Sequence, residues 1–253
     1  MNDSTKDDGP PIGEDHEHSA TARQDAGRSK RVRHAVGVGL CVTALAAGAT
    51  AMSFGPSAAA TPRVLLYVGV TYAVLAIVTL IGLWRRGELA RRMTPKFGDI
   101  SVAGLIAVTL HLAAIVVVAF LIGTPREGWI MRVYLHVGDP ATTRLAGVAV
   151  LVALVAACEE IVWRGLVNAK LIEAFGSVRG ILSGTLLYAL AHVSTVYLLR
   201  DVAAGLNPLV LVAAAGCGLV WGVVADQTER LMPSIAAHAL FTWSVVVFPL
   251  WQL

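Results

Sequence analysis

Two adjacent carboxylates and a cation lie in the apolar stretch LVALVAACEEIVWRGLVNAK, residues 151–170. Burying one charged side chain at the centre of a bilayer costs at least about 2.5 kcal/mol, so such groups need a partner, water or a chemical function. Glu160 and Arg164 are four residues apart, on one helical face and in the favourable order of acid before base. Glu159 points about 100° away around the helix. One carboxylate can therefore form an ion pair while its neighbour faces something else.

The other ionisable groups deep in apolar segments are three histidines, His111, His192 and His238. Tyr188 and His192 share one helical face at a spacing of four residues. His238 and Thr242 form part of a polar stripe at the same spacing, and such a stripe must face protein or water rather than lipid. His111 has no polar neighbour at helical spacing, so we interpret it as a packing or hydrogen-bonding residue.

Two carboxylates and two imidazoles on three helices are compatible with three kinds of site. They could ligate a metal ion such as zinc. A carboxylate could act as general base on a water molecule, with the imidazoles orienting the water and stabilising an oxyanion. The same groups could relay protons in a transporter. The residues leave these three open, whereas the absence of an HExxH helix, a Gly-x-Ser-x-Gly elbow and an aspartate pair within the spans disfavours other hydrolytic sites.

The composition is that of a membrane protein. Of the 253 residues, 56% are hydrophobic and 15% are charged, against roughly 45 to 50% and about 25% in soluble domains. The formal net charge of +3 is small, and the basic residues lie beside the apolar segments rather than on one soluble module. We therefore expect the lipid bilayer as a partner and no nucleic acid.

The order of polar and apolar stretches predicts an all-α fold, a polytopic membrane helix bundle of about seven transmembrane helices. Residues 1–33 have almost no large apolar side chains, so we predict a disordered tail. The apolar stretch at 35–54 is a retained first span rather than a cleaved signal peptide, because its basic flank lies far from residue 1. Further stretches near the roughly 20 residues that cross the hydrocarbon lie at 63–84, 98–123, 145–170, 179–199, 207–224 and 231–251.

These stretches divide into N-terminal transmembrane helices at 35–123 and a helical core at 145–251, with a short interfacial helix predicted at 129–136. Near the span ends, fourteen Lys and Arg residues fall on the side of the tail and five on the other. The positive-inside rule predicts a cytoplasmic N-terminus. We expect an integral protein of the cytoplasmic (inner) membrane.

Three motifs on three spans resemble the CPBP intramembrane proteases, a family that includes the type II CAAX prenyl endopeptidase and bacterial Abi-type proteins. They are Glu-Glu-x-x-x-Arg at Glu159, Glu160 and Arg164, aromatic-x-x-x-His at Tyr188 and His192, and His-x-x-x-polar at His238 and Thr242. The resemblance covers about residues 145–250. It implies hydrolysis of a peptide bond near the end of a membrane-anchored protein or peptide, without a covalent enzyme intermediate.

The resemblance also implies a role for each motif residue. Glu159 would be the general base that activates water, and His192 would help to hold that water. His238 and Thr242 would stabilise the oxyanion. The remaining motif residues would support the site structurally, namely Glu160, Arg164 and Tyr188.

Two positions depart from the family's pattern. The first aromatic residue is commonly Phe and is Tyr188 here, which is a mild change. The last position is usually Asn or Asp and is Thr242 here, whose hydroxyl can still donate one hydrogen bond. Losing an oxyanion donor costs roughly 10² to 10³ in rate, so the strength of catalysis depends on Thr242.

Family members were long described as metalloproteases, and the groups that would hold a zinc ion here are Glu159, His192 and His238. We favour a metal-free glutamate mechanism. The functions that the resemblance implies are CAAX-type processing, processing of C-terminal sorting tails, or a role in bacteriocin immunity. The alternative is a non-enzymatic membrane scaffold or transporter that retains the fold, which the change to Thr242 supports.

Overall fold

A computed structural model describes residues 14–137 and 145–250, and over these ranges the chain is helical apart from turns and a single bridge between Asp201 and Gly205. The helices are α1 (Glu14–Ser53), α2 (Arg63–Arg85), α3 (Leu89–Met93), α4 (Asp99–Ala119), α5 (Glu127–Val137), α6 (Leu145–Val162), α7 (Ala169–Phe175), α8 (Ser177–Leu190), α9 (Val193–Leu198), α10 (Leu209–Thr228) and α11 (Met232–Val247). A 3₁₀ turn, η1 (Pro56–Ala58), follows α1, and a π-helical segment, η2 (Trp163–Asn168), joins α6 to α7.

A helix occupies each of the seven predicted spans, which confirms the all-α membrane bundle. Among the residues that the structure describes, five helical segments are long and apolar enough to cross a membrane: Ala26–Ser53, Arg63–Arg85, Asp99–Ala119, Ser177–Leu198 and Leu209–Thr228. The last apolar helix, α11, is shorter. The Glu-Glu stretch lies in α6, which continues through η2 into α7. The short helix predicted at 129–136 is present as α5.

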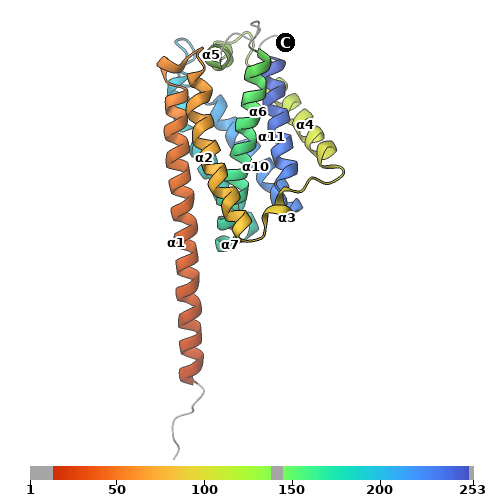
Figure 1. Ribbon diagram of the computed structural model, residues 1–253. Coiled ribbons are helices and arrows are strands. Elements are labelled where there is room, and N and C mark those ends of the chain that lie inside the picture. The colour runs from red at the N-terminus through yellow and green to blue at the C-terminus, as the bar shows by residue number, and fades with distance from the viewer. Residues whose placement is uncertain (1–13, 138–144, 251–253) are drawn as a thin grey trace, which may run out of the picture.

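The first helix begins well before the predicted span. Residues 1–13 of the predicted disordered tail lie outside the described part of the chain, but from Glu14 the backbone is helical without a break. Figure 1 shows this part of α1 projecting from one end of the bundle. A helix already nucleated in a membrane span gains one hydrogen bond for each further residue and needs no core of its own.

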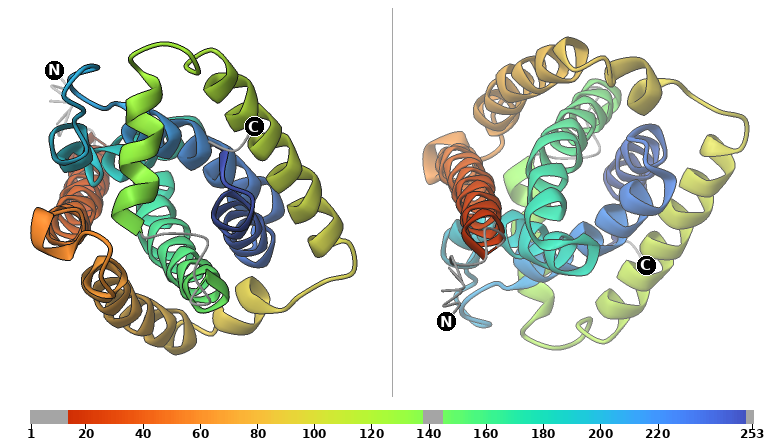
Figure 2. Two further views of the ribbon diagram at one scale, coloured as in Figure 1. Left: turned by 90° about the horizontal axis from the view of Figure 1, so that it is seen from above. Right: turned by 90° about the horizontal axis from the view of Figure 1, so that it is seen from below.

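Helix α6 lies at the centre of the bundle (Figure 2). It packs against α2 on one side and against α11 on another, while α10 packs against α8 and α11 against α4. Helices of the predicted N-terminal part and of the predicted core therefore share one bundle. The largest fully buried side chains include Trp163, Trp221 and Tyr72, all close to the Glu-Glu stretch, whereas the outer helices expose Leu, Ile and Val side chains, as lipid contact favours.

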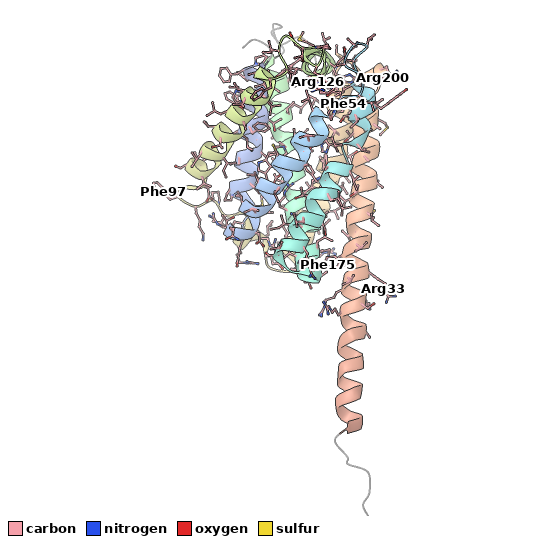
Figure 3. The ribbon with its side chains drawn as sticks, turned by 180° about the vertical axis from the view of Figure 1, so that it is seen from behind. Arg33, Phe54, Phe97, Arg126, Phe175 and Arg200 are labelled. Atoms are coloured by element: carbon pink, nitrogen blue, oxygen red, sulfur yellow. The ribbon has the colours of Figure 1, made fainter. Side chains whose placement is uncertain are left out.

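The two ends of the bundle are chemically different, and Figure 3 labels residues at each. Arg33 and Phe175 mark the end from which α1 projects, and Phe54, Arg126 and Arg200 mark the opposite end. At the α1 end Arg230 pairs with Asp99 at 2.7 Å, and Arg91 pairs with Glu229 at 3.2 Å. These two pairs tie the ends of α10 and α11 to α3 and α4.

At the opposite end, α5 is fastened to the bundle by three side chains. Tyr134 donates a hydrogen bond to the carbonyl of Val245 at 2.8 Å, and Asn207 donates to the carbonyl of Trp129 at 2.9 Å. Arg132 pairs with Asp201 at 3.3 Å, where hydrogen bonds from the Ala204 and Ala203 backbone hold the pKa of the carboxyl below its ordinary value. Helix α5 is thus fixed to the loop after α9 and to α11.

His111 on α4 has a polar partner that the sequence did not reveal. Its Nδ1 lies 3.0 Å from the hydroxyl oxygen of Ser244 on α11. Because the Ser244 hydroxyl already donates to the carbonyl of Phe241 at 2.7 Å, it accepts from the imidazole. The interpretation of His111 as a packing or hydrogen-bonding residue is therefore confirmed, since it links α4 to α11.

Glycines allow α7, α8 and α10 to approach closely. A Cβ atom on Gly180 of α8 would lie 2.5 Å from the backbone nitrogen of Ile172, and one on Gly184 would lie 2.0 Å from Oδ1 of Asn168. On α10, a Cβ on Gly218 would lie 2.9 Å from the Tyr188 ring. Both helices carry a Gly-x-x-x-Gly pattern, which is typical of close helix contacts in membranes.

We predict that Gly180→Ala destabilises the protein, because the new methyl group meets backbone atoms of α7 that cannot move aside as a flexible side chain can. The expected loss is about 1–3 kcal/mol, measured as unfolding in detergent or lipid. Gly104→Ala on α4 is the matched control, since nothing lies within 4 Å of its Cβ, and alanine is the better helix former. Equal effects of the two changes would contradict the close α7–α8 contact.

Candidate active site

Glu160 is the centre of a buried network of charges. Its side chain is 0% exposed and that of Arg164 is 1% exposed, and Arg164 Nη1 lies 3.1 Å from Glu160 Oε1. The ion pair predicted from the spacing of four is therefore present. Arg164 also donates from Nη2 to the carbonyl of Gly218 at 2.7 Å, so the pair connects α6 and η2 to α10.

His238 on α11 contacts Glu160 and not Glu159. Its Nδ1 lies 3.0 Å from the same Glu160 oxygen that faces Arg164. Because a carboxylate only accepts hydrogen bonds, Nδ1 carries the hydrogen and Nε2 is left for another partner. The imidazole stacks on Trp221 with ring centroids 3.7 Å apart. Packing of α11 against α6 thus brings His238 to Glu160, the carboxylate to which the family resemblance gives a supporting role.

Glu159 belongs to a second group, formed with α8. The Tyr188 hydroxyl donates to Glu159 Oε2 at 2.8 Å, and the Tyr188 and His192 rings are 4.9 Å apart in an edge-to-face arrangement. His192 Nδ1 donates to the carbonyl of Tyr188 at 2.9 Å, which leaves Nε2 as an acceptor. Since His192 lies at the break between α8 and α9, its backbone departs from helical geometry at this point.

The Thr242 hydroxyl is engaged within its own helix. It donates to the carbonyl of His238 at 2.8 Å, the usual bond of a helical threonine to the residue four before it. Ser234, on the same stripe, likewise donates to the carbonyl of Leu231 at 3.0 Å. The imidazole of His238 is therefore the one side chain of the polar stripe Ser234, His238 and Thr242 that points its hydrogen-bonding atoms out of α11 and into the site.

The predicted site residues thus form two neighbouring groups on α6. Glu159, Tyr188 and His192 make one, and Glu160, Arg164 and His238 make the other. Within the described ranges, no group of three or more His, Cys, Asp or Glu side chains could hold a metal ion. Glu159, His192 and His238, named for zinc, therefore do not form such a group in this structure.

Sequence reasoning missed the π-helical segment and the residues that it orients. Segment η2 follows Glu160 by three residues and buries Trp163, Arg164 and Asn168. Trp163 donates to the Tyr72 hydroxyl on α2 at 2.9 Å. The available signal for Tyr72 was its place in the middle of a predicted span. No sequence pattern indicated the π-helix, a feature that often marks functional sites.

A pocket of about 290 Å³ opens at the α1 end of the bundle. Arg164 and Asn168 lie in its lining, together with the ends of α3, α10 and α11, and the lining residues that carry charge are Arg91, Arg92, Arg164, Asp226, Glu229 and Arg230. The pocket therefore reaches the guanidinium that pairs with Glu160. The two glutamates themselves are not part of its lining.

We predict that Arg164→Leu is strongly destabilising, because it leaves the Glu160 carboxylate buried with one cation fewer. Breaking a buried ion pair from one side costs about 3–5 kcal/mol, which unfolding in detergent will measure. The matched control is Arg86→Leu, which removes the pair of Arg86 and Glu88 at 3.4 Å where the arginine side chain is 44% exposed. Such surface pairs contribute about 0–1 kcal/mol, so similar losses in the two variants would contradict the buried network.

Comparisons with known proteins support one family. Residues 141–244 match the family model described as type II CAAX prenyl endopeptidase Rce1-like. No curated protein and no solved structure matches the chain. The matched segment contains both groups of side chains around α6. The helical core that carries the candidate site is therefore similar to the Rce1-like type II CAAX prenyl endopeptidases, which supports the resemblance to the CPBP intramembrane proteases.

Proposed function

We propose that this chain is an intramembrane endopeptidase that hydrolyses a peptide bond of a membrane-anchored protein with water activated by Glu159. The observation that carries the proposal is the difference between the two adjacent carboxylates. Glu160 is fully buried and holds Arg164 and His238, whereas Glu159 keeps 8% of its surface exposed. Glu159 is thus the carboxylate that remains free to contact water.

The reaction follows from the remaining hydrogen-bonding groups. Glu159 takes a proton from water as the water oxygen adds to the substrate carbonyl carbon, and the same proton then passes to the leaving nitrogen. His192 accepts a hydrogen bond from the water through Nε2. His238, when protonated, donates from Nε2 to the oxyanion, and Glu160 stabilises the imidazolium as a carboxylate does in a catalytic triad. No covalent intermediate forms.

The mechanism is of the glutamate type, and no step runs through a metal ion. A zinc-dependent mechanism is the alternative within the same family, with Glu159, His192 and His238 as its ligands. In the present arrangement His238 contacts Glu160 at 3.0 Å, so ligation by all three would require this histidine to change partners. The separation of the two groups on α6 favours the metal-free form.

The substrate is a membrane-anchored protein that approaches from the cytoplasm. Support comes from the pocket at the α1 end, which reaches Arg164, and from α5, which is fastened over the opposite end. The basic residues counted from the sequence orient that α1 end toward the cytoplasm of the inner membrane. CAAX-type processing is the activity that the matched family implies, with sorting-tail processing and bacteriocin immunity as alternatives.

A second candidate is a non-enzymatic scaffold or transporter that retains the protease fold. It is favoured by the Thr242 hydroxyl, which donates to the His238 carbonyl and so offers no hydrogen to an oxyanion. One oxyanion donor in place of two would weaken catalysis, yet the acid and both imidazoles are retained. The two candidates differ in whether the function requires Glu159 to take a proton from water and then give it up.

We predict that Glu159→Gln abolishes peptide cleavage, because the amide keeps the size of the side chain and cannot take a proton. The measurement is release of product from a fluorogenic prenylated CAAX peptide by the full-length protein in liposomes. Glu173→Gln on α7, an exposed carboxylate, is the matched control and should cleave at the wild-type rate. Cleavage by Glu159→Gln at that same rate would contradict the enzyme proposal, whereas a scaffold function would persist in this variant.

We predict that Thr242→Val changes the cleavage rate little, because the hydroxyl that it removes is already bonded to the His238 carbonyl at 2.8 Å. Valine keeps the shape of threonine and the packing of α11. A true oxyanion donor would cost about 10² to 10³ in kcat when lost. A loss of that size would show that Thr242 turns toward the substrate during the reaction, as the family resemblance implies.

A further inference from the structure

The Tyr188 ring is fixed from several sides. Its centroid lies 5.2 Å from that of Trp163 and 4.9 Å from that of His192, and the Arg164 guanidinium lies over its face at 5.0 Å. A Cβ on Gly218 would come within 2.9 Å of it, so α10 also approaches the ring. The side chain is 3% exposed. This enclosure leaves the phenol little freedom to move.

Packing alone does not account for the hydroxyl. A phenylalanine would fill nearly the same volume and would bury no polar group, which costs free energy unless a partner is present. Among the described residues, the partner of the Tyr188 hydroxyl is Glu159 Oε2 at 2.8 Å. Hydrogen bonds to an ionised acceptor are roughly twice as strong as those between neutral groups.

The bond divides the two oxygens of the Glu159 carboxylate. Oε2 is occupied by the phenol, and within the described part of the chain no hydrogen bond reaches Oε1. Glu159 nevertheless keeps some contact with solvent. A hydrogen bond from a rigid donor to one oxygen restricts the orientation of the carboxylate and leaves its other oxygen without a protein partner among the described residues.

We propose that Tyr188 is a positioning residue for hydrolysis, whose hydroxyl holds Oε2 of Glu159 so that Oε1 takes the proton from the attacking water. The proposal rests on the function proposed above. As the water oxygen bonds to the carbonyl carbon, its proton moves to Oε1, and Tyr188 keeps its own proton. When the carbon–nitrogen bond breaks, the proton on Oε1 passes to the leaving nitrogen and the carboxylate is restored.

The expected effect is on kcat rather than on KM, because Tyr188 acts on the geometry of the base. A misplacement of a reacting group by about 1 Å can cost about 10²-fold in rate. Tyr188→Phe should therefore lower kcat by about 10- to 100-fold and leave KM nearly unchanged. Tyr72→Phe is the matched control, since Tyr72 is equally buried but its hydroxyl accepts from Trp163.

The test uses the full-length protein in liposomes and the fluorogenic prenylated CAAX peptide. A second series replaces Tyr188 with fluorinated tyrosines, which strengthen the phenol as a donor without changing the fold, so kcat should vary in step with phenol acidity. Infrared spectra with ¹³C-labelled glutamate supply a readout that needs no cleavage. The Glu159 carboxylate band, identified by its loss in Glu159→Gln, should shift in Tyr188→Phe and stay in place in Tyr72→Phe.

The outcomes separate the two proposals. If wild type cleaves, Glu159→Gln does not, and Tyr188→Phe keeps the wild-type kcat, the positioning role is overturned while the protease stands. If wild type and Glu159→Gln cleave alike, the protease proposal itself fails. If wild type cleaves no such peptide, the infrared band decides, and an unchanged band position in Tyr188→Phe overturns the hydrogen bond and the role built on it.

Discussion

The structure depends on one buried ion pair in the middle of the bundle. Glu160 and Arg164 are almost fully excluded from solvent, and neither could remain there charged without the other. Each also binds a different helix, because Glu160 holds His238 on α11 and Arg164 holds the Gly218 carbonyl on α10. The cost of burying charge in a membrane therefore fixes the relative positions of α6, α10 and α11 more firmly than apolar contacts can, since lipid offers those as well.

This pair also frees its neighbour for chemistry. Successive residues on a helix point about 100° apart, so Glu159 cannot reach the cation that Glu160 holds and instead faces α8. There it meets the Tyr188 hydroxyl at 2.8 Å. One carboxylate is held by charges and the other by a neutral donor. Two identical side chains thus acquire different environments from helix geometry alone, as the proposed roles of support and base require.

Local spacing predicted more of this site than long-range packing could reveal. The Glu160–Arg164 pair and the helical spans follow from periodicity within single segments. The partner of His238 does not, because it depends on which face of α11 packs against α6. The same holds for Tyr72, whose place beside Trp163 joins α2 to η2. The π-helix and the internal bond of Thr242 were equally hidden, since both reflect choices among backbone hydrogen bonds that side-chain patterns leave open.

Besides the buried ion pair, the site requires the backbone of α10 to approach Tyr188 and Arg164 closely. Tyr188 can lie under Arg164 and against α10 only because residue 218 lacks a side chain, as a Cβ there would meet the ring at 2.9 Å. The carbonyl of the same glycine accepts the hydrogen bond from Arg164 at 2.7 Å. One residue of α10 therefore serves both groups on α6, since its missing side chain admits the phenol that holds Glu159 and its carbonyl holds the cation of Glu160. Any larger residue at 218 would disturb both of these groups, so the geometry of Glu159 and the burial of the ion pair are coupled through α10.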